Sequence, residues 1–113
     1  MKKKLAQGAI GTGAGTLAYT VPTTPKTVYV TTVKIIDITN TTVGALTVRI
    51  HLVPVGVAVG ATNALAYDLA VAANSLLAVL RQGDHVLNTG DFIQCIASGA
   101  GLVMNISGEV EKE

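Results

Sequence analysis

Aromatic and charged residues are scarce in this 113-residue chain. Aromatic side chains make up 4% of it, with no Trp, and charged side chains make up 13%, about half of the roughly 25% expected of a soluble globular protein. Eight Lys and Arg residues stand against seven Asp and Glu residues, so no basic excess indicates nucleic-acid binding. Because a weakly charged chain rich in Val, Ile, Leu and Ala favours burial between copies, we expect an obligate homo-oligomer.

Cysteine is represented by Cys95 alone, which excludes an internal disulfide. A metal centre would have to combine Cys95 with His51 and His85, which lack the close spacing of ligand pairs, so we predict neither a metal nor another cofactor. His51 is instead expected on the polar side of a strand. The longest low-charge stretch, residues 52–80, is interrupted by Pro and Gly, and no 18-residue window predicts a membrane helix.

Catalytic motifs are also missing from the sequence. No GxSxG elbow surrounds a serine, and the glycine run at residues 8–15 neither follows a strand nor opens a helix. The few carboxylates show no pairing typical of glycoside hydrolysis. We therefore predict no enzymatic activity and no catalytic residues.

Two segments in the first half of the chain predict strands. Residues 26–39 are dense in Val, Ile, Thr and Tyr. Their apolar parity changes part-way, which indicates a bulge near Thr31 and Thr32 or burial on both faces. Residues 45–53 alternate between apolar and polar side chains, the pattern of a half-buried strand. Asn40, followed by two threonines, supplies the turn between the two strands.

Residues 64–81 fit two structures. Their leucines fall close to one face of a helix, and alanine is the best helix former. The alternative is a pair of strands, residues 65–71 and 76–79, broken at Asn74 and Ser75, which favour turns. The local pattern leaves both structures open.

A tight turn is predicted at residues 87–93, with the sequence LNTGDFI. Gly90 is expected to adopt a positive φ, and the Asp91 carboxylate to accept hydrogen bonds from local backbone amides. After this turn, residues 92–97 and 102–110 are predicted to form a β-hairpin around a glycine-rich turn.

These elements amount to about seven or eight short strands, which predict an all-β fold: an antiparallel β-sandwich, jelly-roll-like in topology. We expect the chain to divide into a flexible, basic and Gly-rich N-terminal arm (residues 1–14), the β-sandwich domain (residues 15–110) and a charged tail (residues 111–113).

The N-terminal arm carries the candidate partner-binding residues Lys2, Lys3 and Lys4. Clustered ammonium groups on a mobile segment are attracted to an acidic surface at low salt. The alternative is a solvated terminus without a partner.

Four motifs follow one another along the chain: GTLAYTVP at residues 15–22, a long Val/Ile strand that ends at Asn40, LNTGDFI at residues 87–93, and ISGE at residues 106–109. In this order the chain resembles small structural proteins of tailed bacteriophages, in which the motifs are written GTLYTVP, LxxGDxI and ISGVE. The similarity extends over residues 7–110.

This resemblance implies a virion component, made in the cytoplasm of a bacterial host, with no catalytic residues. It would be a capsid decoration (cement) protein or a tail- or fibre-associated module, usually a jelly-roll-like homotrimer. It also favours two strands over a helix in residues 64–81. Its partners would be copies of the chain and the major capsid protein or tail proteins, without nucleic acid or membrane.

A decoration protein adds its binding free energy to the stability of the shell by mass action, and several copies add avidity. On this hypothesis the basic arm orders against the shell, and the loop at residues 55–62 faces outward or contacts neighbours. The alternative function is a receptor- or carbohydrate-binding module at a tail tip. With one Phe, three Tyr and no Trp, the chain has few aromatic platforms for sugars.

Overall fold

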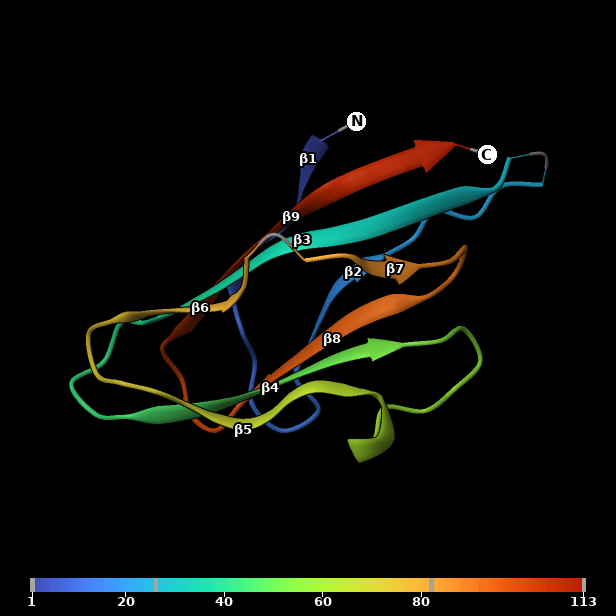
Figure 1. The fold of residues 1–113 in the computed structure, drawn as a ribbon. Coiled ribbons are helices and arrows are strands. Elements are labelled where there is room, and N and C mark those ends of the chain that lie inside the picture. The colour runs from blue at the N-terminus through green and yellow to red at the C-terminus, as the bar shows by residue number, and fades with distance from the viewer. Residues whose placement is uncertain (1, 26, 82, 113) are drawn as a thin grey trace.

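The computed structural model describes residues 2–25, 27–81 and 83–112, which form two antiparallel β-sheets packed face to face (Figure 1). Sheet A contains, in spatial order, β1 (Lys2–Ala9), β9 (Leu102–Lys112), β3 (Tyr29–Asn40) and β6 (Leu76–Leu80), and β7 (His85–Leu87) also pairs with β3. Sheet B contains β2 (Thr16–Thr20), β8 (Phe92–Ala97), β4 (Leu46–Val53) and β5 (Ala64–Val71), and the 3₁₀ turn η1 (Ala61–Asn63) precedes β5. The predicted antiparallel β-sandwich is confirmed.

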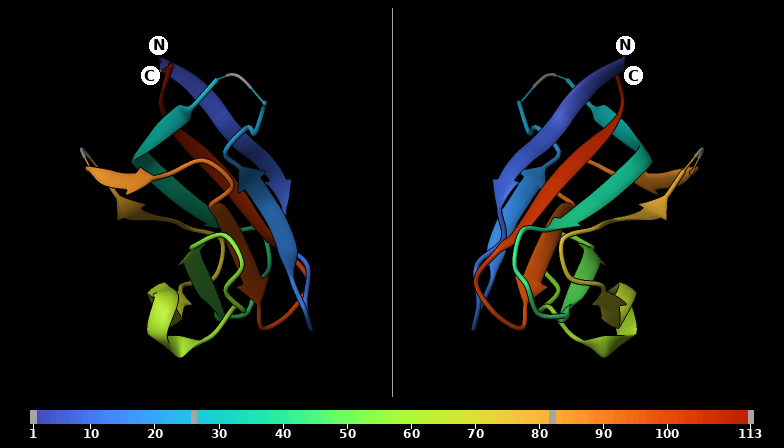
Figure 2. Two further views of the ribbon diagram at one scale, coloured as in Figure 1. Left: turned by 90° about the vertical axis from the view of Figure 1, so that its right-hand side faces the viewer. Right: turned by 90° about the vertical axis from the view of Figure 1, so that its left-hand side faces the viewer.

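The strands pair in the order of a jelly roll. β6 and β7 occupy one strand position, because they pair with successive halves of β3. Counted so, the first strand pairs with the last, the second with the seventh, the third with the sixth and the fourth with the fifth. A long antiparallel hairpin rolled into two sheets has this pairing. Figure 2 shows the two layers from the two ends of the sandwich.

The ambiguous segment at residues 64–81 forms the two strands β5 and β6, not a helix. The break falls at the predicted turn, where Asn74 adopts a φ of 52° and its amide donates to the Thr42 carbonyl oxygen (2.9 Å). Ser75 Oγ donates to the Ala72 carbonyl oxygen (2.7 Å). Pairing with β4 and β3 thus overrides the helical propensity of the leucines and alanines.

The core lies between the two sheets and is mainly aliphatic. Its largest fully buried apolar side chains are Ile36, Ile38, Ile50, Ile93, Leu102 and Ile106. Polar contacts also join the two sheets: Tyr19 of sheet B and the buried Thr31 of sheet A share a hydrogen bond between their hydroxyl oxygens (2.9 Å). Buried polar groups are tolerated when they are paired in this way.

The parity change in β3 is produced by a bulge. The register of β3 against β9 shifts between Val33 and Ile35, two residues beyond the predicted position at Thr31 and Thr32. Close backbone contact at this bulge requires Gly108 of β9, because a Cβ there would overlap the Thr32 carbonyl oxygen. The bulge turns both halves of the long strand toward the core.

The prediction of a flexible arm at residues 1–14 is wrong for Lys2–Ala9, which form β1. This strand pairs with β9 along its length, and Ala6 and the following Ile10 are buried against the core. The exposed backbone edge of β9 and these apolar contacts hold the segment in the sheet. The predicted tail at residues 111–113 likewise belongs to β9 as far as Lys112; the first and last residues of the chain lie outside the described part.

The predicted hairpin between β8 and β9 is also wrong. β8 pairs with β2 and β4 in sheet B, whereas β9 pairs with β1 and β3 in sheet A. The turn at residues 98–101 therefore carries the chain from one sheet to the other. Turn residues indicate a reversal of direction but do not decide whether the flanking strands pair.

Candidate functional site

The lysines predicted to bind a partner lie on the edge strand β1. Lys3 and Lys4 are exposed, and Lys4 Nζ donates to Gln7 Oε1 (2.6 Å). The side chain of Lys2 lies outside the described part of the structure. Lysines on an edge strand oppose pairing with a foreign strand, so the position of these lysines has a structural explanation that needs no partner.

An open groove of about 640 Å³ lies on the outer face of sheet A, lined in part by Lys3, Lys34, Asp84 and Glu109. Lys34 Nζ donates to Asp84 Oδ1 over 2.7 Å. This hydrogen bond raises the pKa of Lys34 and lowers the pKa of Asp84. The groove is lined by charges of both signs, so it does not select a ligand of one charge.

The Asp91 turn is confirmed and does more than close a local loop. Gly90 has a φ of 86°, and Asp91 Oδ2 accepts the Asn88 amide (2.9 Å). The other oxygen, Oδ1, accepts the amide of Val55 (2.9 Å), which is 36 residues away in the chain. One carboxylate therefore joins the turn after β7 to the loop after β4.

The segment before β3 and the loop after β4 both lie at this end of the sandwich, the right-hand side of Figure 1 and the near side in the left panel of Figure 2, and together they contain four exposed valines. We call them the valine end: Val28, Val55, Val57 and Val59, which are 50%, 63%, 49% and 39% exposed. Three of them belong to the loop that Asp91 fixes. A contiguous exposed apolar patch marks a surface that another protein covers.

The loop at residues 54–63 also folds over the outer face of sheet B, where it covers His51. This side chain lies on the same face of β4 as Arg49, the polar side predicted for it, and the loop leaves it only 2% exposed. His51 Nδ1 lies 3.0 Å from the Gly60 carbonyl oxygen and 3.1 Å from Asn63 Oδ1; since both atoms accept, Nδ1 carries the proton. Asn63 Nδ2 donates to the Ala58 carbonyl oxygen (3.0 Å), and the loop is held as one unit.

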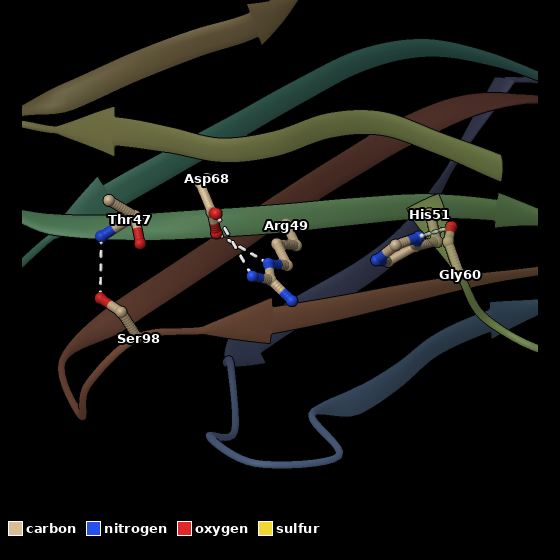
Figure 3. A network of polar contacts seen from close by, with 6 residues as sticks. All are labelled: Thr47, Arg49, His51, Gly60, Asp68 and Ser98. Atoms are coloured by element: carbon tan, nitrogen blue, oxygen red, sulfur yellow. Dashed lines mark hydrogen bonds and ion pairs between the residues drawn. The ribbon is translucent and has the colours of Figure 1, made fainter. Parts of the chain in front are cut away.

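A second polar cluster lies beside His51 on the outer face of sheet B (Figure 3). Arg49 donates from Nε to Asp68 Oδ1 (2.7 Å) and from Nη2 to Asp68 Oδ2 (3.2 Å). The guanidinium carbon lies 4.1 Å from the ring centre of Tyr67. The hydrogen bond lowers the pKa of Asp68 and raises that of Arg49.

The backbone of β5 places Asp68 in this cluster. Its register against β4 shifts between Val48 and Ile50, and Asp68 has a φ of 54°, an uncommon conformation for a residue other than glycine. The bulge aims the carboxylate at Arg49. Sequence reasoning missed the cluster because Arg49 and Asp68 are 19 residues apart and lie on different strands.

The described residues hold no group of three or more His, Cys, Asp or Glu side chains that could bind a metal ion. Cys95 is buried, and burial raises the pKa of its thiol to about 12, so the reactive thiolate is rare at neutral pH. In the part of the chain that the structure describes, no helix has the length and apolar character to cross a membrane.

Comparison with known proteins identifies no relative: no protein family, curated protein or solved structure matches this chain.

Proposed function

We propose that this protein is a non-enzymatic structural component of a bacteriophage virion, a capsid decoration protein that binds the shell as a homotrimer and stabilises it. The virion assignment rests on the sequence resemblance. The structural observation that supports a function in assembly is the valine end, where four exposed apolar side chains lie in two loops and three of them belong to the loop that Asp91 fixes.

The energetics favour assembly through many copies. Complete burial of a valine contributes about 1.5–3 kcal/mol, and the valines of this end are roughly half-exposed. Covering them would therefore contribute about 1 kcal/mol each, which is weak for one copy. A trimer that presents three such ends gains avidity without further contacts, and each bound trimer stabilises the shell by mass action.

The oligomer is tested by multi-angle light scattering across a wide dilution range. We expect a mass near three times 11.5 kDa for the natural chain and also for the double variant Val55→Ser, Val57→Ser, which should instead lose affinity for purified capsids because its shell-binding end is altered. Val43→Ser is the matched control, because Val43 is 92% exposed but lies in the turn between β3 and β4, at the opposite end. A natural chain that is monomeric at every concentration would contradict the proposed trimer.

The virion assignment needs a separate experiment. Phage particles are induced from the bacterium that encodes the chain, purified on a density gradient and digested for mass spectrometry. We expect peptides of this chain in a fixed ratio to those of the major capsid protein. Purified particles that contain the capsid protein and no peptide of this chain would overturn the assignment.

A further inference from the structure

A small pocket on the outer face of sheet B has no role in the proposed assembly. It encloses about 190 Å³ and is lined by Thr47, Arg49, Asp68, Ile96, Ala97 and Ser98. Pockets for drug-sized ligands have volumes of about 300–1,000 Å³. This pocket therefore suits a single small ring rather than an extended molecule.

Several polar groups of the pocket retain hydrogen-bonding capacity. Arg49 uses Nε and Nη2 on Asp68, and its remaining terminal nitrogen points away from that carboxylate (Figure 3). Ser98 Oγ accepts the Thr47 amide (2.9 Å), so its own hydroxyl proton is free to donate. The side chain of Asp68 is 52% exposed, and each of its oxygens keeps a lone pair for a further donor.

This arrangement suits adjacent hydroxyl groups. A hydroxyl donates one proton and accepts at its oxygen, so one hydroxyl of a diol can donate to Asp68 while it accepts from Arg49. The serine and threonine hydroxyls offer the same two functions on the other side of the pocket. Ile96 supplies an apolar surface for carbon-bound hydrogens.

The charge of the pocket favours a neutral ligand. Arg49 and Asp68 form a two-point ion pair, so their charges cancel and no cation is left to attract a phosphate or sulfate. Charge-assisted hydrogen bonds from such a pair are stronger than those between neutral groups. A neutral ligand with many hydroxyls benefits from them without a charge of its own.

The cluster is also held in place before any ligand arrives. Tyr67 stacks on the guanidinium of Arg49 (4.1 Å), and the bulge in β5 fixes Asp68 at a φ of 54°. A strained backbone of this kind costs on the order of 1–3 kcal/mol and is concentrated at functional sites. Fixed side chains lose less entropy when a ligand binds.

We propose that the pocket formed by Thr47, Arg49, Asp68 and Ser98 binds one pyranose ring of a neutral saccharide, through adjacent hydroxyls. This site lies away from the valine end, so it remains open when the loops are covered. The proposal does not depend on the virion assignment.

The test is a two-dimensional ¹⁵N–¹H NMR titration of the natural chain. The probes are methyl α-D-mannopyranoside, methyl β-D-galactopyranoside and methyl β-D-glucopyranoside, each to about 50 mM, since we expect a Kd on the order of 1–10 mM. Saturable shifts are expected at the amides of Arg49, Asp68 and Ser98 for at least one glycoside. The absence of saturable shifts for all three would overturn the proposal.

Variants locate the binding site and separate it from general effects on folding. Arg49→Gln should weaken binding at least ten-fold, because it removes both the free donor and the partner of Asp68. Arg81→Gln is the matched control, since it breaks another surface ion pair, with Asp37 (2.9 Å) on sheet A, and should leave the Kd unchanged. Equal affinity in Arg49→Gln and the natural chain would place the sugar elsewhere and refute the site.

A third variant keeps the ion pair intact. Thr47→Val combined with Ser98→Ala removes two hydroxyls and should weaken binding about thirty-fold, the effect of two hydrogen bonds at roughly 1 kcal/mol each. Sodium sulfate is titrated in parallel. If sulfate shifts the amides of this pocket and the glycosides do not, the site is an anion site and the saccharide proposal is wrong.

Discussion

Replacement of Asn40 by alanine should be among the most damaging single changes to this fold. The side chain is 1% exposed, and Nδ2 donates to the carbonyl oxygens of Gly44 (2.9 Å) and Val71 (3.1 Å). Oδ1 accepts from the amide (2.9 Å) and from the hydroxyl (2.7 Å) of Thr42. One side chain thus ties the end of β3 in sheet A to the end of β5 in sheet B.

The expected loss follows from these four hydrogen bonds. Each contributes about 0.5–1.5 kcal/mol net, and a buried polar group left without a partner costs about 1–3 kcal/mol. The Val71 carbonyl lies in a buried hydrogen bond and would be left without its donor. We expect Asn40→Ala to lower the free energy of unfolding by about 4 kcal/mol, out of roughly 6–17 kcal/mol for a domain of this length.

The assay is urea denaturation followed by far-UV circular dichroism, because the chain has no Trp to report on unfolding. With a slope of about 2 kcal/mol per molar urea, the midpoint of Asn40→Ala should fall by about 2 M. Asn88→Ala is the control: Asn88 is exposed, and its replacement should change stability by less than about 0.5 kcal/mol. A loss below about 1 kcal/mol for Asn40→Ala would refute the reasoning.

Three further predictions follow from other positions. Gly108→Ala should lower the free energy of unfolding by at least about 2 kcal/mol, as forced overpacking does. Gly44→Ala should not lower it, because no atom lies within 4 Å of a Cβ added at Gly44. Thermal melts of the two variants make the comparison. The pKa of Asp84 is lowered from 3.8 by the hydrogen bond from Lys34, so its stabilising contribution is complete above that pH and is lost as the pH falls further. In Asp84→Asn the urea midpoint should therefore depend less on pH below about pH 4 than it does in the natural chain. The same pH dependence in both proteins would show that the Asp84 ion pair does not contribute to stability. Cys95 should resist iodoacetamide at pH 8 in the native protein and react in urea; rapid native alkylation, read by mass spectrometry, would show that the thiol is accessible.

Local signals in the sequence were sufficient for the strands and turns with strong alternation or turn chemistry. β4 is confirmed to within one residue of its predicted start, and Gly90 adopts the predicted positive φ. The Asp91 carboxylate accepts the predicted local amide. Each of these features is set by a few neighbouring residues, which is why pattern and turn chemistry predict it.

Features set by distant parts of the chain could not be predicted. β1 is a strand because the edge of β9 accepts it, and His51 is buried because a loop nine or more residues later folds over it. The Arg49–Asp68 pair depends on a bulge in β5. In each case the deciding contact joins segments that are far apart in the sequence, and a local pattern does not show that they come together in the fold.

The pairing of β9 has a consequence for the order in which the fold can form during synthesis. β9 lies between β1 and β3, yet of the strands it leaves the ribosome last. Until then β1 has no partner within sheet A, and one edge of β3 is open. Contacts between chain ends are slow to form because their loop-closure entropy is large. The nascent chain thus exposes unpaired strand edges until β9 has been synthesised, and before that point it would be most prone to aggregate or to need a chaperone.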